Sequence, residues 1–370
     1  MRIGLVIYGD LEQASGGYLY DRHLVSLLKK RGHTVQVISM PWNRPIRAVL
    51  DNYSNRAFQK LKNLRVDVLL QDELNHPSLF LLNEKLKKEV TYPIISIVHM
   101  LRSRAHSEHS FKWLTQRIEA KYLNSVDGFV FNSQETGRIV KSMLTKSKPS
   151  VVATPGGNRF KPKITDKEIR DRARQAGPLR VLFLGNLTRN KAPHLLIEAA
   201  AELKRESIFL TFAGRSDVEP DYTEYLLRLA AGLKMDDWLY FAGHLEGKML
   251  EAAIQTSQVL AIPSAYEGFG IAYLEGMGFG LPAIATRGVG AKEIVRNGRN
   301  GFLITVGDSE RLSSILKRLN SDRKLLARMG LAARQSFLKF PTWDQSMRRV
   351  EKFLASYNES IRQPTLRRKK

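Results

Sequence analysis

The sequence predicts an α/β protein with two doubly wound, Rossmann-like domains, each built on a parallel sheet, and a cleft between them. Short apolar segments typical of buried strands alternate with longer segments in which apolar residues recur at helical spacing. This alternation restarts after a proline-containing stretch near the middle of the chain. The length of 370 residues is enough for two domains of ordinary size.

The first domain is expected over residues 1–160. Leu24, Leu27 and Leu28 recur at helical spacing within residues 18–31, and Gly32 follows, a residue type that commonly ends helices. Short apolar segments that predict strands cover residues 2–8, 34–39, 66–70, 93–98, 128–131 and 151–153. Because helical stretches separate them, a parallel sheet covered on both faces is predicted.

A linker is expected at residues 161–178, because the polar, lysine-rich stretch from Pro155 to Pro178 shows little apolar periodicity. The second domain is expected over residues 179–340. Its candidate strands cover residues 180–184, 209–213, 239–242, 259–263, 283–285 and 302–304, with helices at 193–204 and 222–233. Residues 341–370 are expected to form an amphipathic helix and a basic tail, with the helix packing on its own domain or crossing back to the first.

Composition narrows the function classes. Hydrophobic residues make up 43% of the chain, and no apolar run is long enough to cross a bilayer. The N-terminal segment lacks the features of a secretion signal, and the absence of cysteine excludes disulfides and thiolate metal sites, so we expect a cytoplasmic protein. The net charge of +23 indicates an anionic partner such as nucleic acid, acidic lipid headgroups or a phosphorylated substrate, or else a solvated basic surface without one.

The most informative motif is E-G-F-G-I-A-Y-L-E, from Glu267 to Glu275, between a predicted strand and a predicted helix. Its glycines let backbone N–H groups approach a ligand, and a helix N-terminus attracts phosphate. The two carboxylates would lie roughly 12 Å apart, whereas glycosidase pairs lie about 5–9.5 Å apart. The alternative is two exposed glutamates. We predict a site for a sugar joined to a nucleotide through a diphosphate, made by Glu267, Gly268, Phe269, Gly270, Ile271 and Glu275.

Two cations follow the predicted strand at residues 180–184, within the segment N-L-T-R-N-K. Arg189 and Lys191 at the carboxyl end of a strand would stabilise a diphosphate leaving group as it gains charge. We predict both as catalytic residues, together with Glu267 and His99, and Asn186 as a donor-binding residue. The alternative is that these are ordinary exposed side chains.

The first domain offers three further candidates. Gly16 and Gly17 lie between the first strand and the first helix without the G-x-G-x-x-G spacing of nicotinamide sites, so they form either a tight turn or a backbone that approaches the donor. His99 ends an apolar strand and would either hydrogen-bond a sugar or acceptor hydroxyl or be packed in the core. The acidic segment at residues 72–76 could supply a base but is unspecific.

These motifs together resemble the retaining glycosyltransferases of family 4, which have the GT-B fold. The resemblance is strongest over residues 181–304, where the motif is followed by G-L-P-A-I-A-T, and it reaches the first domain through Gly16, Gly17 and His99. It implies that Glu267 binds the donor sugar, that Glu275 binds the ribose and that Lys191 contacts the diphosphate. It also implies that neither metal nor cofactor is required.

One departure from the family pattern affects the phosphate-binding residues. The family usually has Gly-Arg-Leu after the first strand of the second domain, whereas this chain has Asn186 at the arginine position. Arg189, three residues further on, could supply the charge from the same loop. Ala192 stands where the family often has glycine.

The resemblance implies transfer of a hexose from a UDP or GDP sugar to an acceptor hydroxyl with retention, in glycolipid or polysaccharide assembly. The basic charge fits a lipid-linked acceptor and docking at the inner face of an anionic membrane. The alternatives are another GT-B activity, nucleotide-sugar epimerisation or sugar phosphorolysis. A nucleic-acid-binding protein is disfavoured because zinc-finger spacing and RNP-like aromatic strands are absent from the sequence.

Overall fold

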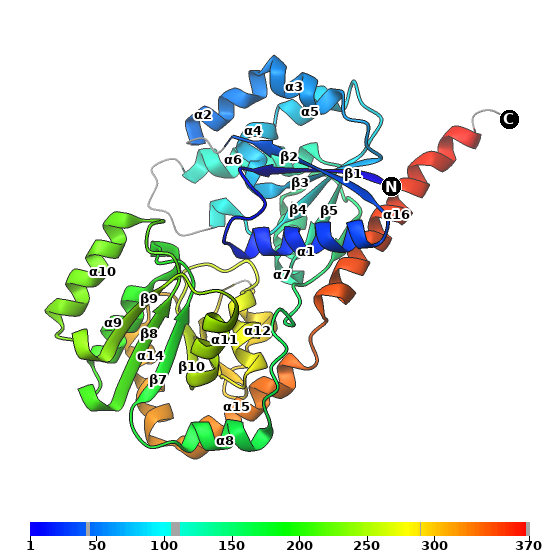
Figure 1. Cartoon of the computed structure of the whole chain (residues 1–370). Helices are drawn as coiled ribbons and strands as arrows, with labels where there is room; N and C mark the ends of the chain where they lie inside the picture. The colour runs from blue at the N-terminus through cyan, green and yellow to red at the C-terminus, as the bar shows by residue number, and fades with distance from the viewer. Residues whose placement is uncertain (42–44, 105–111, 289, 368–370) are drawn as a thin grey trace. The chain divides into compact units, whose positions relative to one another are not determined.

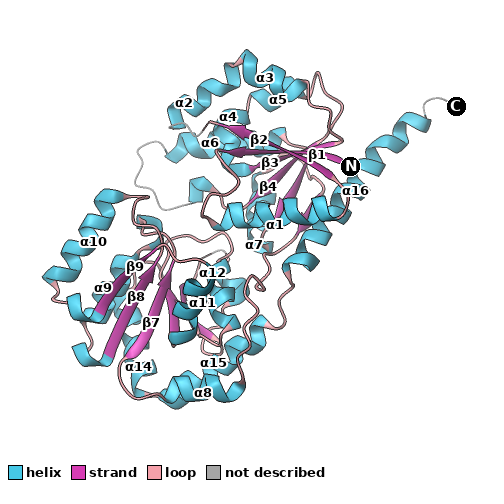
Figure 2. Cartoon of the chain, viewed as in Figure 1, coloured by secondary structure: helices cyan, strands magenta, loops and turns pink. Residues whose placement is uncertain are grey.

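The computed structural model of the chain describes residues 1–41, 45–104, 112–288 and 290–367 (Figure 1). The chain divides into two compact units, Met1–Pro155 together with Pro341–Lys370, and Gly156–Phe340. Each unit contains a six-stranded sheet in its described residues, with helices around it (Figure 2). The predicted α/β class with two doubly wound domains is confirmed.

The sheet of the first unit has the strand order β2-β1-β3-β4-β5-β6, and its neighbouring strands are parallel. The central strands β3, β4 and β5 are buried along their whole length, because helices cover both faces of the sheet. The winding direction reverses between β1 and β3, where the crevice of such a sheet opens at the carboxyl ends. The strands are β1 Arg2–Tyr8, β2 Thr34–Met40, β3 Val68–Asp72, β4 Ile94–Val98, β5 Gly128–Phe131 and β6 Ser150–Val152.

The helices of the first unit begin at recognisable caps. The side chain of Ser15 accepts a hydrogen bond from the N–H of Tyr18, and Ser133 caps a later helix in the same way, which satisfies N–H groups that lack a helical partner. The helices are α1 Gly16–Lys30, α2 Pro45–Leu50, α3 Asn55–Lys62, α4 His76–Leu79, α5 Leu82–Leu86, α6 Lys112–Ser125, α7 Gln134–Met143 and α16 Trp343–Arg367, with short 3₁₀ helices η1 Asp51–Tyr53, η2 Glu73–Asn75 and η3 Arg102–Arg104.

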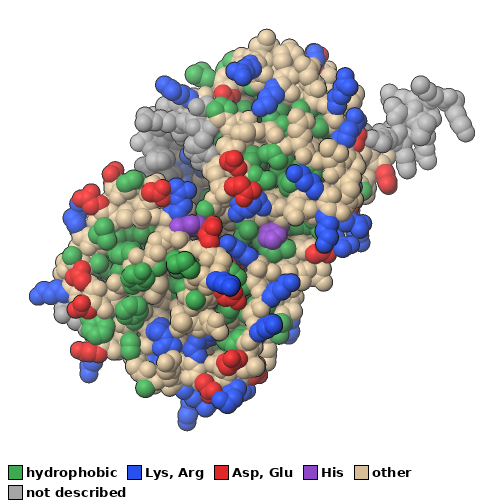
Figure 3. Space-filling view, viewed as in Figure 1, with side chains coloured by type: hydrophobic (Ala, Val, Ile, Leu, Met, Phe, Trp, Pro, Cys, Tyr) green, Lys and Arg blue, Asp and Glu red, His purple; other side chains and the backbone are tan. Residues whose placement is uncertain are grey.

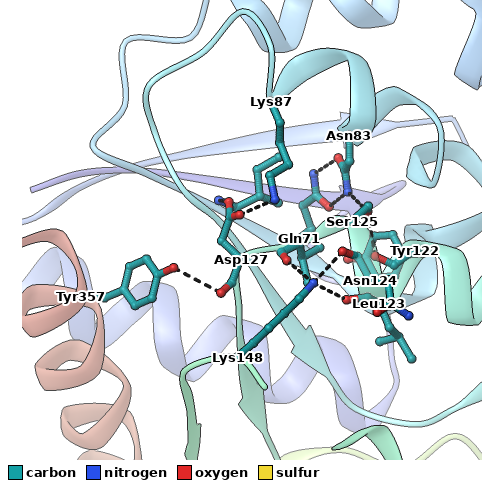
Figure 4. Close-up of polar contacts among 12 residues, drawn as sticks. Gln71, Asn83, Lys87, Tyr122, Leu123, Asn124, Ser125, Asp127, Lys148 and Tyr357 are labelled. Carbon is teal, nitrogen blue, oxygen red and sulfur yellow. Dashed lines mark hydrogen bonds and ion pairs between the residues drawn. The ribbon is translucent and has the colours of Figure 1, made fainter. Parts of the chain in front are cut away.

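The C-terminal helix α16 belongs to the first unit and packs on α1. The indole of Trp343 stacks on the ring of His23 with centroids 4.1 Å apart. Further along the same helix, Oε1 of Glu351 lies 3.0 Å from Nε2 of His33. The hydroxyl of Tyr357 donates to the carbonyl oxygen of Asp127 at 3.2 Å (Figure 4). Within the described residues, none of the helices is both long enough and apolar enough to cross a membrane.

The sheet of the second unit has the strand order β12-β11-β10-β7-β8-β9, again with parallel neighbours. Its winding reverses between β7 and β10, so the loops that follow these two strands meet at one edge. The strands are β7 Leu179–Leu184, β8 Ile208–Ala213, β9 Leu239–Gly243, β10 Val259–Ile262, β11 Ala283–Thr286 and β12 Gly301–Ile304.

A helix occupies the segment at 161–178 that was expected to be a linker. Helix α8 begins at a capping box in which the Thr165 and Glu168 side chains each bind the backbone N–H of the other. Ile169 and Ala173 are buried one turn apart, and the helix packs on α15. The helices of this unit are α8 Asp166–Arg174, α9 Pro193–Ala201, α10 Pro220–Gly232, α11 Gly247–Thr256, α12 Ile271–Gly278, α13 Ala291–Ile294, α14 Ser309–Ser321 and α15 Arg323–Phe337, with η4 Arg189–Lys191, η5 Arg205–Ser207 and η6 Asp236–Trp238.

Ala192 joins η4 to α9 in the left-handed conformation, with φ of 49° and ψ of 47°. This conformation costs a residue with a side chain about 1–2 kcal/mol. Ala192→Gly should therefore raise the free energy of unfolding by about 0.5–1 kcal/mol, because the greater entropy of an unfolded glycine offsets part of the gain. Urea unfolding measures the difference.

The matched control is Ala252→Gly at an exposed position of α11, which should lower the free energy of unfolding by about 1 kcal/mol. Ala192 is only 4% exposed, so its methyl group also packs. If Ala192→Gly destabilised the protein as much as the control does, packing of the methyl group would outweigh the backbone strain, contrary to this prediction.

Candidate active site

Three loops of the second unit meet beyond the carboxyl ends of β7, β10 and β11. These strands are adjacent, because β10 pairs with β7 on one side and with β11 on the other. The loops are residues 185–191, 263–270 and 287–290, of which residue 289 lies outside the described part of the chain. The predicted residues Lys191 and Glu267 thus come from strands on either side of the point where the winding reverses.

An ion pair joins the first two of these loops. Nζ of Lys191 contacts Oε1 of Glu267, and the hydroxyl of Ser264 donates to the same oxygen at 2.8 Å. The Glu267 side chain is 11% exposed and that of Lys191 is 26% exposed, so the cation keeps access to solvent while the carboxylate is mostly covered. A ligand could therefore reach Lys191 without rearrangement of the surrounding backbone.

Asn190 fastens the same two loops through its backbone and its side chain. Its carbonyl oxygen accepts from the N–H of Ala265 at 2.7 Å, and its side-chain amide donates to the carbonyl oxygen of Tyr266 at 3.0 Å. Both contacts lie next to the Lys191–Glu267 pair in sequence. They fix the backbone on both sides of the pair, which reduces the freedom that ligand binding would otherwise remove.

The Gly268-Phe269-Gly270 loop is held by the third loop. The N–H of Gly290 donates to the carbonyl oxygen of Glu267 at 3.0 Å, and a Cβ atom on Gly290 would lie 2.2 Å from Cα of Phe269. Gly270 has φ of 95° and precedes α12 without a capping side chain. The first N–H groups of α12, beginning at Ile271, therefore have no side-chain acceptor and suit an anion.

Glu275 lies on α12 and is only 5% exposed. Its Oε1 lies 3.4 Å from Nη1 of Arg159, a residue that the sequence motifs did not single out. Burial raises the pKa of Glu275 above its usual value, and the charge of Arg159 offsets part of this increase. The helix thus carries an N-terminus suited to anions and a buried carboxylate with a cation beside it.

The other two predicted residues of the first loop have different surroundings. Asn186 is partly buried, and its side-chain oxygen accepts from the N–H of Arg215 at 3.4 Å. The guanidinium of Arg189 pairs with Glu219 at 3.3 Å, is 66% exposed and lies 5.1 Å from the ring centre of Tyr222. In this structure Lys191 contacts Glu267. Arg189 instead contacts Tyr222 on α10 and Glu219, the residue that precedes this helix.

The predicted residues of the first unit lie beside one another. Gly16 and Gly17 are the first residues of α1, and a Cβ atom on Gly17 would lie 3.1 Å from Cδ2 of His99. His99, which follows β4, is 8% exposed, and its Nε2 lies 3.0 Å from Oδ1 of Asp21 on α1. No sequence motif marks Asp21, because it is a single aspartate inside an amphipathic helix.

A second buried group lies next to these residues. Glu73, His76 and Glu119 are each at most 1% exposed. Burial raises the pKa of Glu73 to about 8 and that of Glu119 to about 7, and lowers that of His76 to about 4. The Glu119 carboxylate accepts from the backbone and hydroxyl of Ser103. Oε1 of Glu73 lies 3.0 Å from Nδ1 of His76, so the three side chains form one buried polar cluster.

Residues 165–336 match the family described as Glycosyl transferases group 1. The chain is 30% identical over 241 residues to the D-inositol 3-phosphate glycosyltransferase of Streptomyces scabiei, a match that covers 62% of this chain and 53% of that protein. The present chain spans about half the length of the curated relatives that it matches.

Solved structures match over nearly the full length. Sucrose-phosphate synthase from Thermosynechococcus elongatus has a TM-score of 0.78 at 18% identity and covers 99% of both chains. Anabaena HepE in complex with UDP-glucose has a TM-score of 0.75 at 19% identity and covers 96% of this chain and 100% of that one. At such identities the likeness establishes the fold.

Fold and loop geometry together define a GT-B protein with a candidate ligand site at the winding reversal of its second sheet. Residues 165–336, most of the second unit, match the glycosyl transferases group 1, the family that the sequence resemblance predicted. The GT-B fold was predicted correctly, whereas the roles of the individual site residues remain predictions.

Gly290→Ala tests the loop arrangement. The added methyl group would overlap the backbone of Phe269, so the Gly268-Phe269-Gly270 loop must move away from the third loop. We expect the affinity for a nucleotide sugar to fall at least tenfold and the free energy of unfolding to fall by about 1–3 kcal/mol. Calorimetric titration and urea unfolding measure the two effects.

Gly288→Ala is the control, because a Cβ atom there would meet other atoms no closer than 3.8 Å. It should leave both quantities nearly unchanged. Unaltered ligand affinity in Gly290→Ala would show that the Gly268-Phe269-Gly270 loop does not contact the ligand.

Proposed function

We propose that the protein is a retaining glycosyltransferase that transfers a hexose from a nucleoside diphosphate sugar, with UDP or GDP as the nucleotide, to an acceptor hydroxyl. The observation that carries the proposal is the Lys191–Glu267 ion pair beside the uncapped N-terminus of α12. It places a solvent-accessible cation, a helix N-terminus without a capping side chain and a carboxylate within one group of loops. A diphosphate bonded to a sugar needs that combination of groups.

Each group has a chemical role in this proposal. Lys191 and the first N–H groups of α12 stabilise the diphosphate as it gains negative charge on leaving. Glu267 accepts hydrogen bonds from the donor sugar, together with the amides of the Gly268-Phe269-Gly270 loop. Glu275 accepts hydrogen bonds from the ribose hydroxyls. Arg159 stabilises the ionised form of Glu275, since a buried carboxylate without a cation would tend to take up a proton.

A thermal-shift screen with UDP-, GDP- and ADP-sugars tests the donor class, because a ligand that binds only the folded state raises the melting temperature. The matching sugar should raise it, and Lys191→Ala should abolish the rise. Incubation with the labelled donor then separates the activities. A glycosyltransferase needs an acceptor, an epimerase alters the donor sugar alone, and a phosphorylase releases a sugar phosphate with inorganic phosphate.

Arg189 is proposed as a second cation for the diphosphate, in place of the family arginine that is absent at Asn186. It must leave Glu219 to take this role. Arg189→Ala should therefore lower turnover at least tenfold, while the free energy of unfolding changes by less than about 1 kcal/mol, because the pair with Glu219 is exposed. Steady-state kinetics and urea unfolding measure these quantities.

Glu219→Gln is the matched variant, because it removes the same ion pair but keeps the guanidinium. Turnover in this variant should be equal to or above that of the wild type. Equal turnover in Arg189→Ala and the wild type would remove Arg189 from the mechanism and leave Lys191 as the cation of this loop.

The proposed acceptor is lipid-linked, and the protein is proposed to act at the cytoplasmic face of an anionic membrane. Lys and Arg side chains are spread over the surface in Figure 3, in keeping with the net charge of +23. In the first unit, two cations lie over aromatic rings, one pair joining α5 to η1 and the other lying within α6. Lys85 lies 5.4 Å from the ring centre of Tyr53, and Arg117 lies 5.2 Å from that of Trp113.

Exposure of these rings supports a membrane role. Tyr53 is 68% exposed and Trp113 is 55% exposed. Helix α5 packs on α3, η1 and α6, so the elements that carry these residues are neighbours. Exposed aromatic rings favour the headgroup region of a bilayer, and lysine and arginine favour its anionic lipids.

Liposome co-sedimentation tests this proposal. Binding should increase with the fraction of anionic lipid and fall with salt, because it depends on screened charges. The double variant Tyr53→Ser with Trp113→Ser should bind at least threefold more weakly. Tyr240→Ser, which removes a ring of the second unit that is 58% exposed, is the control and should bind as the wild type does. If the wild type failed to sediment at low salt with anionic vesicles, membrane docking would be ruled out.

A further inference from the structure

One face of α1 is directed at His99. A Cβ atom on Gly17 would lie 3.1 Å from Cδ2 of His99, the ring centre of Tyr20 lies 5.0 Å from that of His99, and Oδ1 of Asp21 lies 3.0 Å from its Nε2. Positions 17, 20 and 21 lie on the same side of a helix, because they are three and four residues apart. The helix therefore fixes the imidazole by packing and by one polar contact.

The two ring nitrogens of His99 have different surroundings. Nε2 is occupied by Asp21, whereas Nδ1 has no hydrogen-bond partner among the described residues. The backbone is held as well, since the side-chain amide of Asn132 donates to the carbonyl oxygen of His99 at 2.6 Å. His99 keeps an exposed fraction of 8%. The imidazole is thus oriented from one side, and within the described residues only Nε2 is engaged.

The charge of Asp21 requires compensation. Asp21 is fully buried, and its second carboxylate oxygen has no hydrogen-bond partner within the described part of the chain. A buried carboxylate is costly unless a cation accompanies it. No Lys or Arg is paired with Asp21 in the described residues, so His99 is the group that can supply the positive charge.

Three acidic groups near His99 each raise its pKa. Tyr20 and Asp21 face it from α1, and Asp72 and Glu73 face it from the end of β3 and from η2. Burial lowers the pKa of His99, but Asp21 above all, with smaller contributions from Asp72 and Glu73, outweighs burial and raises the pKa to about 9.

We propose that Asp21 is a positioning residue that holds His99 as an imidazolium, so that Nδ1–H is fixed as a hydrogen-bond donor to a substrate oxygen. This inference rests on the proposed transferase function. A neutral imidazole with its proton on Nε2 would instead present Nδ1 as an acceptor. Asp21 therefore decides whether this position selects an oxygen acceptor, such as a sugar hydroxyl or phosphate oxygen, or a donor group.

Nuclear magnetic resonance of the full chain labelled with ¹⁵N-histidine tests the charge directly. His99→Gln assigns the signal. In the wild type, both ring nitrogens of His99 should have imidazolium shifts at pH 7.5 and titrate near pH 9. In Asp21→Asn, burial should prevail and the pKa should fall to about 6.5 or below. Unchanged titration in Asp21→Asn would overturn the proposal.

Glu351→Gln is the matched control, because Glu351 lies 3.0 Å from His33 in a second histidine–carboxylate pair on α16. It should leave the titration of His99 unchanged.

Protonated His99 is favoured in the folded state, so its contribution to stability is complete below about pH 6.5 and is lost as the pH rises through about 9. If Asp21→Asn does not fold, the wild-type titration still decides, and a wild-type pKa at or below 6.5 would refute the proposal.

Calorimetric titration with UDP-glucose as the probe measures the role of Nδ1. Asp21→Asn should bind it about tenfold more weakly at pH 7.5, the loss of one charged hydrogen bond, and should recover affinity below pH 6, where His99 is protonated again. Equal affinity and an equal pH profile in wild type and variant would overturn the proposal.

If the screened UDP-, GDP- and ADP-sugars all fail to bind the wild type, the transferase function and the role of Nδ1 both fail, whereas the His99 titration can still confirm the ion pair.

Discussion

The ion pair between Lys191 and Glu267 is the interaction on which the candidate site depends. It joins the loops after β7 and β10, the two strands between which the winding of the second sheet reverses. Without a ligand, each charge neutralises the other, so neither is left uncompensated near the low-dielectric interior. A diphosphate that contacts Lys191 would take over part of this role and release Glu267 to accept hydrogen bonds from hydroxyl groups. Before binding, the pair can thus hold the two loops together. After binding, it can supply a cation for the diphosphate and a carboxylate that accepts hydrogen bonds from hydroxyl groups.

The first unit uses an equivalent arrangement with different residues. The winding of its sheet reverses between β1 and β3. Helix α1 follows β1, Asp72 ends β3 and His99 follows β4, and these three parts lie close together. Here too an acid and a base neutralise each other in a buried setting, through Asp21 and His99. In both units the reversal of the strand order gathers loops at one edge of the sheet. Charged groups that would be costly anywhere else in the core occupy that edge.

Sequence patterns predicted the strands well, because apolar segments in a parallel sheet are continuous and easily recognised. They indicated the Lys191 and Glu267 loops as a candidate site because glycines and charges coincide there, and the roles of these residues remain predictions. They failed for α8, where only Ile169 and Ala173 are buried and charged residues conceal the amphipathic pattern. The capping box of Thr165 and Glu168 was the signal that could have identified this helix. Asp21 and Arg159 were missed for a different reason, since each acquires meaning only from a partner distant in sequence.

Packing alone does not account for the buried charged residues of the first unit. Hydrophobic replacements of similar size often stabilise a protein when they replace a buried ion pair, so stability alone does not explain why Asp21, Asp72, Glu73 and Glu119 all lie beneath the surface of one unit. Asp21 contributes most, with Asp72 and Glu73, to a pKa of His99 that is raised to about 9, whereas burial by itself would lower it. If the cluster served only packing, neutral side chains would fill the same volume at lower cost. Its composition is therefore better explained by the charge that it maintains on one imidazole at the edge of the sheet.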